Sequence, residues 1–140
     1  MRICLTTWAD AAFEDMKSLC VTTLQRYCES QDIDIRVYED IDSGRPPAWN
    51  KIPVVRRLLQ EYDFVFWIDS DAIFVRFDED IREEIRPDKD LYLVKHHINA
   101  QDVPNTGVLL VRNSRWSCGL LDRLWAMAQY GFDEMKISSP

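Results

Sequence analysis

Paired acidic residues are the part of this sequence most suited to chemistry. The pattern Asp-x-Asp occurs five times, at positions 32/34, 40/42, 69/71, 78/80 and 88/90. Four of these pairs lie in polar stretches, where solvated carboxylates are the ordinary interpretation. Asp69 and Asp71 differ because they directly follow the apolar run Phe64–Ile68. A charge at the end of a buried strand needs a cation or hydrogen bonds to offset its lost hydration, so this pair is the candidate site.

Two carboxylates at this spacing could share one metal ion. In an extended segment, residues i and i+2 point the same way, with Cα atoms roughly 6–7 Å apart. One carboxylate could then reach Mg²⁺ or Mn²⁺ and the other a ribose hydroxyl or a water, while the small Ser70 keeps the approach open. Oxygen ligands suit these ions, which often complete their shells with substrate phosphates. The alternative is that Asp69 caps the next turn and Asp71 is only a surface residue.

The first half of the chain alternates strand and helix patterns. Apolar and β-branched residues predict strands, and apolar residues spaced three and four apart predict an amphipathic helix whose stripe is Phe13, Met16, Cys20, Leu24 and Tyr27. The continuous apolar run indicates a central strand covered on both faces. The predicted order is strand Arg2–Trp8, helix Ala12–Glu29, strand Ile33–Tyr38, loop Asp40–Pro47, a helix from between Trp49 and Pro53 to near Glu61, and strand Phe64–Ile68.

The second half adds two strands and a helix. The strands are predicted at Leu91–Lys95 and Gly107–Arg112. The helix should start near Ser114, with Asn113 or Ser114 as N-cap and Gly131 as its stop. Its apolar stripe is Leu120, Leu121, Leu124, Trp125 and Ala128.

This alternation predicts one compact α/β domain over residues 1–140, with a mostly parallel sheet and helices on both faces. Ligands of such sheets bind beyond the carboxyl ends of the strands. The regions to inspect are therefore Thr6–Asp10, Glu39–Pro47, Asp69–Ile73 and the segment around His96.

Charge and composition exclude several kinds of partner. A net charge of −7 argues against nucleic acid or an anionic membrane as the main partner. No apolar stretch is long enough to span a membrane, so the chain as it stands is expected in the cytosol, or in the Golgi lumen if it is a fragment of a longer protein. The spacing of Cys4, Cys20, Cys28 and Cys118 matches no zinc site, and buried thiols are predicted rather than disulfides.

Three blocks of sequence together resemble a known family. They are Pro47-Ala48-Trp49-Asn50-Lys51-Ile52-Pro53, then Tyr62 to Ala72 with its Trp67-Ile68-Asp69-Ser70-Asp71 end, and Pro104-Asn105-Thr106-Gly107 running on to Trp116. In order and spacing they resemble the galactosyl/mannosyltransferase family, glycosyltransferase family 34. The resemblance covers roughly Trp49 to Trp125.

The resemblance implies a GT-A (Rossmann-like) fold and a metal-dependent, anomer-retaining glycosyltransferase. Its donor would be a UDP- or GDP-linked sugar, its acceptor a glycan, protein or lipid, and its metal Mn²⁺ or Mg²⁺. By position, Asp69 and Asp71 would bind the metal and the donor's ribose and diphosphate. The other implied donor-site residues are Thr6, Thr7 and Trp8 beside the nucleotide, Lys51 and Ser70 near the donor, and Asn105, Thr106 and Gly107 lining the sugar or acceptor pocket.

Some features leave other interpretations open. Family members usually continue with an Asp-Gln segment and a His that completes the metal site, which this sequence does not contain. His96 and His97 could substitute, although a polar pair at a strand end is favoured. No nucleophile can be named, Asp102 being only conceivable. The alternatives are a non-catalytic nucleotide-sugar-binding domain and, less favoured, a haloacid-dehalogenase-like phosphatase, whose later acidic pair has no counterpart beside the two histidines.

Overall fold

A mixed sheet of five strands forms the centre of the computed structural model, which describes residues 1–9 and 11–127. The strand order is β2-β1-β3-β5-β4. β1 pairs in parallel with both β2 and β3, whereas β5 pairs antiparallel with β3 and β4. The α/β class is confirmed, but the sheet is parallel on one side only. The strands are β1 Ile3–Trp8, β2 Asp34–Tyr38, β3 Phe64–Ile68, β4 Leu91–Ile98 and β5 Gln101–Arg112.

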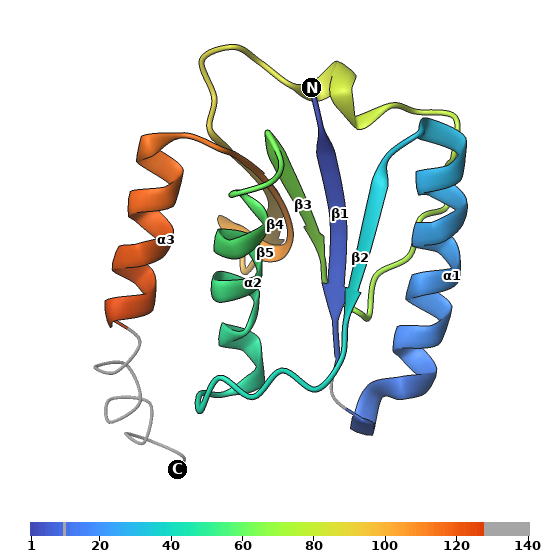
Figure 1. Ribbon diagram of the computed structural model, residues 1–140, viewed down its shortest axis with the longest axis horizontal. Helices are drawn as coiled ribbons and strands as arrows, with labels where there is room; N and C mark the ends of the chain where they lie inside the picture. Colours follow the sequence, from blue (N-terminus) through green and yellow to red (C-terminus); the bar gives the residue numbers. More distant parts are fainter. Residues whose placement is uncertain (10, 128–140) are drawn as a thin grey trace.

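Helices cover both faces of the sheet, as predicted. α1 (Glu14–Gln31) lies on one face, while α2 (Lys51–Leu58) and α3 (Arg115–Met127) lie on the other (Figure 1). Short 3-10 turns, η1 at Ala11–Phe13 and η2 at Pro47–Trp49, lead into α1 and α2, and a third, η3, spans Ile81–Glu84. The result is a three-layer arrangement of helix, sheet and helix.

β3 separates two apolar cores. All five of its residues are buried. Because side chains alternate along a strand, Phe64, Phe66 and Ile68 join the core under α1, while Val65 and Trp67 join the core under α2 and α3. Burying a large apolar side chain contributes about 1.5–3 kcal/mol. The continuous apolar run is therefore explained by burial on both faces.

The helices lie close to their predicted boundaries: α1 spans Glu14–Gln31 where Ala12–Glu29 was predicted, and α2 ends at Leu58 where an end near Glu61 was predicted. The Oγ of Ser114 accepts a hydrogen bond from the Ser117 amide at 3.1 Å, so Ser114 is the N-cap of α3. Ala128 and Gly131, the predicted end of this helix, lie outside the described residues. Phe13 and Met16 are 51% and 43% exposed, so these two residues of the predicted apolar stripe do not join the core.

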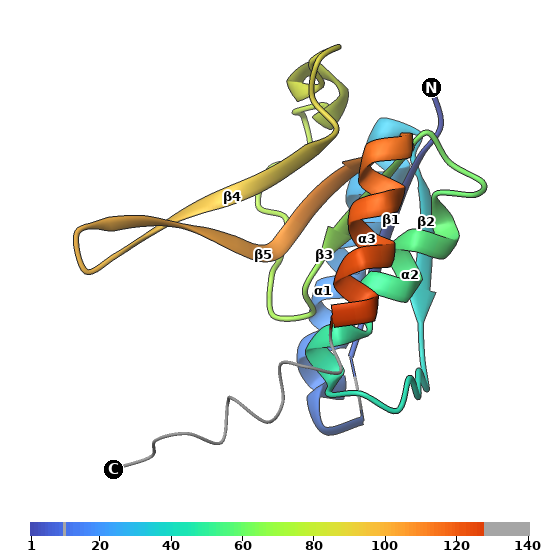
Figure 2. The same ribbon diagram turned by 90° about the vertical axis from the view of Figure 1, so that its left-hand side faces the viewer.

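β4 and β5 form a hairpin that the sequence did not predict. Both strands are longer than expected because a tight turn joins them, with Asn99 and Ala100 at φ 51° and 62°. Two positive φ angles are typical of the type I′ turn, whose usual sequence signal is Asn-Gly rather than Asn-Ala. His96 and His97 therefore lie inside β4 and not after it. The far half of the hairpin extends away from the helical layers (Figure 2).

The cysteines are free thiols, as predicted. Cys4, Cys20 and Cys28 are buried, and Cys118 is half-buried. Burial raises the pKa of Cys4 and Cys28 to about 12 and that of Cys20 to about 11, so these thiols stay protonated near neutral pH. Within the described part of the chain, no helix is both long and apolar enough to cross a bilayer.

Candidate functional site

A crevice of about 330 Å³ lies at the carboxyl ends of β1 and β3. From β1 the chain passes through α1 to β2 on one side, and then through α2 to β3 on the other side. Ligands of α/β sheets bind where the strand order reverses in this way. The lining comprises Trp8, Ala9, Phe13, Met16, Pro47, Ala48, Lys51, Trp67, Asp69, Ser70 and Asp71.

The carboxylate of Asp69 is held by two different elements. Lys51 Nζ, from the start of α2, lies 3.0 Å from Oδ1 of Asp69. The indole Nε1 of Trp67, from β3, donates to the same oxygen at 2.6 Å. The main-chain amide of Asp69 donates to the carbonyl of Gly107 at 2.7 Å. Asp69 is therefore fixed at the meeting point of α2, β3 and β5.

Lys51 connects this carboxylate to β5. Its ammonium also donates to the carbonyl oxygen of Thr106 at 2.9 Å, and it lies 5.7 Å from the ring centroid of Trp67. The Lys51 side chain is 13% exposed, compared with 37% for the side chain of Asp69. Charge-assisted hydrogen bonds are stronger than neutral ones and gain strength where water is partly excluded. Lys51 therefore acts as a well-shielded cation beside the acidic pair.

Asp69 and Asp71 are brought together by a turn. The amide of Ala72 donates to the carbonyl of Asp69 at 3.0 Å, which closes a β-turn over Asp69–Ala72. The expected extended segment is therefore wrong, although both carboxylates line the same crevice. Asp71 is exposed, and Ser70 is half-buried between the two.

An irregularity in β5 carries its backbone to Asp69. The pairing with β4 jumps from Leu93 opposite Leu109 to Val94 opposite Asn105, so residues 106–108 have no partner on β4. Such bulges bend a strand and redirect its groups. Here the carbonyls of Thr106 and Gly107 turn to Lys51 and Asp69.

Gly107 allows β5 to approach the acidic residue closely. A Cβ at this position would lie 3.1 Å from Oδ2 of Asp69 and 3.0 Å from Oδ1 of Asn105. The same Asn105 oxygen accepts the Gly107 amide at 2.7 Å. Any side chain at this position would therefore press on the Asp69 carboxylate.

The ten residues predicted to bind a donor fall into three groups. Trp8, Lys51, Asp69, Ser70 and Asp71 line the crevice. Thr106 and Gly107 touch this group through their carbonyl oxygens and Asn105 is bonded to Gly107, but none of the three lines the crevice. Thr6 and Thr7 are fully buried at the end of β1 and do not line it either.

Sequence reasoning did not assign the larger side chains Trp67, Phe13 and Met16 to the lining. Trp67 could have been found, because a buried indole N–H usually has a hydrogen-bond partner and Asp69 is two residues away on the same face. Phe13 and Met16 gave no such signal, because their spacing in the helix also fits a core. Only their exposure beside the crevice distinguishes them from core residues.

The histidine pair lies in the hairpin, outside the crevice lining. His97 Nδ1 is 3.0 Å from Asp102 Oδ1, and Lys95 Nζ is 3.0 Å from Asp102 Oδ2. These two neighbours, His97 above all, hold the pKa of Asp102 below its usual range. Neither His96, His97 nor Asp102 is among the residues around Asp71 in the crevice.

A divalent cation in the crevice would find the carboxylate oxygens of Asp69 and Asp71. In the part of the chain that the structure describes, no three His, Cys, Asp or Glu side chains converge. Asp69 uses Oδ1 for Lys51 and Trp67, which leaves Oδ2, and Asp71 is exposed. A site with only a few carboxylate ligands suits Mg²⁺ or Mn²⁺, because these ions commonly take their remaining ligands from substrate phosphates and water.

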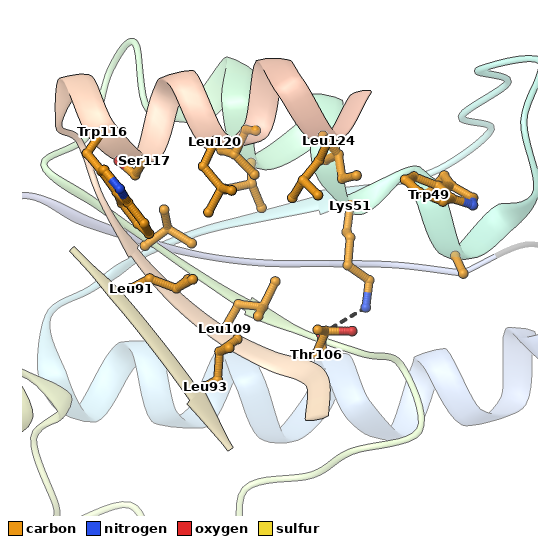
Figure 3. Close-up of a pocket in the computed structure, with 15 residues that line it drawn as sticks. Trp49, Lys51, Leu91, Leu93, Thr106, Leu109, Trp116, Ser117, Leu120 and Leu124 are labelled. Atoms are coloured by element: carbon orange, nitrogen blue, oxygen red, sulfur yellow. Dashed lines mark hydrogen bonds between the residues drawn. The ribbon is translucent and has the colours of Figure 1, made fainter. Parts of the chain in front are cut away.

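A second, mostly apolar cavity of about 480 Å³ adjoins the crevice. It lies between α3 and the β4–β5 strands, where Trp116, Leu120 and Leu124 face Leu91 and Leu109 (Figure 3). Lys51 and Ala48 line both cavities. The Lys51–Thr106 hydrogen bond therefore lies at the boundary between them.

The fold is that of known glycosyltransferases. A glycosyltransferase involved in glycosylation of the major capsid of the virus PBCV-1 superposes with a TM-score of 0.75 at 12% identity, over 91% of this chain and 67% of its own. A mutant of Drosophila β-1,4-galactosyltransferase 7, in complex with manganese, UDP-Gal and xylobiose, superposes with a TM-score of 0.55 at 18% identity, over 81% of this chain and 50% of its own.

Sequence comparison identifies the family. Residues 11–103 match the galactosyl transferase GMA12/MNN10 family, and the chain belongs to it. Xyloglucan 6-xylosyltransferase 1 of Arabidopsis thaliana is 36% identical over 111 residues, which are 71% of this chain and 24% of that protein. Probable glycosyltransferase 2 of Oryza sativa subsp. indica is 34% identical over 118 residues, with 76% and 24% covered. The chain thus spans about a quarter of the length of these relatives.

Proposed function

We propose that residues 1–140 are the donor-binding domain of a metal-dependent glycosyltransferase. The donor is a UDP- or GDP-linked sugar, the acceptor is a glycan, protein or lipid, and transfer retains the anomeric configuration. The observation that carries this proposal is the acidic pair Asp69 and Asp71 in a crevice where the strand order reverses, with Lys51 bonded to Asp69. Family membership and the named activities of the relatives support it.

The nucleotide would lie at the β1 end of the crevice. Trp8, Phe13 and Met16 offer a wall of aromatic and thioether surface suited to a planar base. The buried Thr6 and Thr7 would act by supporting the end of β1 beneath Trp8. Asn105, Thr106 and Gly107 would border the sugar or the acceptor on the β5 side.

The diphosphate would lie between the starts of two helices. α1 and α2 both begin at the crevice, where Met16 and Lys51 line it. Helix starts carry unpaired amides and partial positive charge, which favour anions. The ammonium of Lys51 adds a full charge. Together these groups would offset the charge that builds up on the departing nucleoside diphosphate.

The metal ion would be held mainly by Asp71, with Oδ2 of Asp69 as a second ligand or as an acceptor for the ribose. When bound, Mn²⁺ or Mg²⁺ supplies Lewis-acid stabilisation to phosphate oxygens. Asp69, fixed by Lys51 and Trp67, would set the orientation of the ligand. Because both carboxylates have these tasks, retention would proceed by attack of the acceptor on the same face as the leaving group, without a covalent intermediate.

Calorimetric titration of UDP and GDP, with Mn²⁺ and then with a chelator, tests the proposal. We expect binding of one nucleotide that needs the metal and falls at least about tenfold in Asp71→Asn. The matched control is Asp78→Asn, an exposed acid of another Asp-x-Asp pair that lies outside the crevice. Equal metal-dependent affinity in Asp71→Asn would contradict the assignment.

Two further assays separate the alternatives. Hydrolysis or transfer of the sugar from a bound UDP- or GDP-sugar would exclude a purely binding domain. Release of inorganic phosphate from a generic phosphoester, abolished by Asp69→Asn, would instead favour the phosphatase.

A further inference from the structure

We infer that Trp67 is a positioning residue for the donor site: its indole N–H fixes one oxygen of Asp69 so that the other is presented to metal and donor. The inference rests on the proposed function. It follows from the division of labour at the carboxylate, where Oδ1 receives both Trp67 and Lys51. The described residues offer Oδ2 no hydrogen-bond donor.

The strand geometry makes this contact possible. Trp67 and Asp69 are two residues apart, so their side chains leave the backbone on the same face. The side chain of Trp67 is packed in the core under α2 and α3 and is only 2% exposed. Its N–H therefore has a fixed position, and the 2.6 Å hydrogen bond to a charged oxygen is short and strong.

Two donors on one oxygen restrain the carboxylate more than either alone. Rotation about the Cβ–Cγ bond of Asp69 would break the contacts to Trp67 and Lys51 together. Without the indole, only the longer and more flexible lysine would hold this oxygen. Groups that orient a metal ligand in this way typically contribute 10- to 100-fold to metal affinity or activity.

Trp67→Phe tests the inference because it keeps an aromatic ring in the core and removes the N–H. We expect UDP or GDP, in the presence of Mn²⁺, to bind about 10- to 100-fold more weakly by calorimetry. Phe66→Leu is the matched control for lost packing, because Phe66 is buried in the same strand but faces α1. Like Trp67→Phe, Phe66→Leu should lower the melting temperature, but it should leave the nucleotide affinity unchanged. Trp116→Phe is the control for the loss of an indole N–H, because the indole of Trp116 is 51% exposed and lies outside the crevice. This variant should leave the nucleotide affinity unchanged.

A second measurement needs no ligand. The indole N–H signal of Trp67, assigned through its backbone resonances in the wild-type chain, should shift in the ¹⁵N spectrum of Asp69→Asn and stay in place in Asp78→Asn. An unchanged signal in Asp69→Asn would overturn the inference even if Trp67→Phe failed to fold.

The outcomes distinguish this inference from the proposed function. Wild-type affinity in Trp67→Phe would overturn the positioning role and leave the donor site standing. Absence of metal-dependent nucleotide binding in the wild-type chain would overturn both.

Discussion

Gly107→Ala is expected to disturb the acidic pair from the side opposite Trp67. The new Cβ would lie 3.0 Å from Asn105 Oδ1 and 3.1 Å from Asp69 Oδ2, where ordinary contacts begin at 3.4 Å. Each neighbour must therefore move by a few tenths of an ångström. The backbone itself tolerates alanine, because Gly107 is not in the positive-φ region.

The two neighbours differ in how easily they can move. Asn105 is exposed and can turn away once its bond to the Gly107 amide yields. Asp69 is held by Lys51 and Trp67, so its shift strains both contacts. Overpacking costs about 1–3 kcal/mol, and the exposed Asn105 places this change near the lower end, a few degrees in melting temperature. Since metal–oxygen distances tolerate only about 0.2 Å, we expect metal-dependent nucleotide affinity to fall about tenfold or more.

Thermal melting and calorimetry of the same samples measure the two effects. Gly119→Ala is the control, because a Cβ there meets nothing within 4 Å and the residue lies in α3. Alanine in a helix is favoured over glycine by about 1 kcal/mol, so this control should melt slightly higher and bind normally. Wild-type affinity and melting temperature in Gly107→Ala would refute the close approach between β5 and Asp69.

Two further outcomes follow from burial. Truncating a fully buried tryptophan to alanine typically costs about 3–5 kcal/mol. Because Trp49 is only half-buried, Trp49→Ala should lower the free energy of unfolding by less than this. Urea unfolding measures the change, and a loss of that size or larger would contradict the expectation. Burial raises the pKa of the Cys20 thiol from 9.0 to about 11. In the unfolded chain this thiol therefore loses its proton at lower pH than in the folded protein, so the free energy of unfolding should fall as the pH rises from about 9 to 11. Comparing Cys20→Ala with wild type in melts from pH 7 to 11 tests this, and parallel curves would contradict it.

The layers of the fold could be predicted because burial leaves a clear pattern in the sequence. Phe64–Ile68 is apolar throughout since helices cover both of its faces. Ser114 could be recognised as an N-cap because its hydroxyl satisfies an amide that the helix leaves open. These signals are local, and each depends on a single element and its immediate surroundings.

The hairpin and the bulge could not be predicted because their causes are not local. Asn99-Ala100 is a weak turn signal, since alanine rarely takes a positive φ. The bulge at residues 106–108 exists through contacts with Asp69 and Lys51, which lie far away in sequence. The turn over Asp69–Ala72 likewise replaced the extended segment assumed from the strand before it.

The charges of the crevice explain why metal and nucleotide should bind together. Its described lining carries one ammonium and two carboxylates. Lys51 is paired with Asp69, so the excess negative charge belongs to Asp71. Without a metal ion, a nucleoside diphosphate would be repelled by the carboxylate of Asp71, and this repulsion would offset its attraction to the helix starts and to Lys51. A divalent cation reverses the sign of the excess charge and makes the crevice attractive to the diphosphate. Metal should therefore raise nucleotide affinity in wild type far more than in Asp71→Asn, and an equal gain in both would show that another group neutralises the donor.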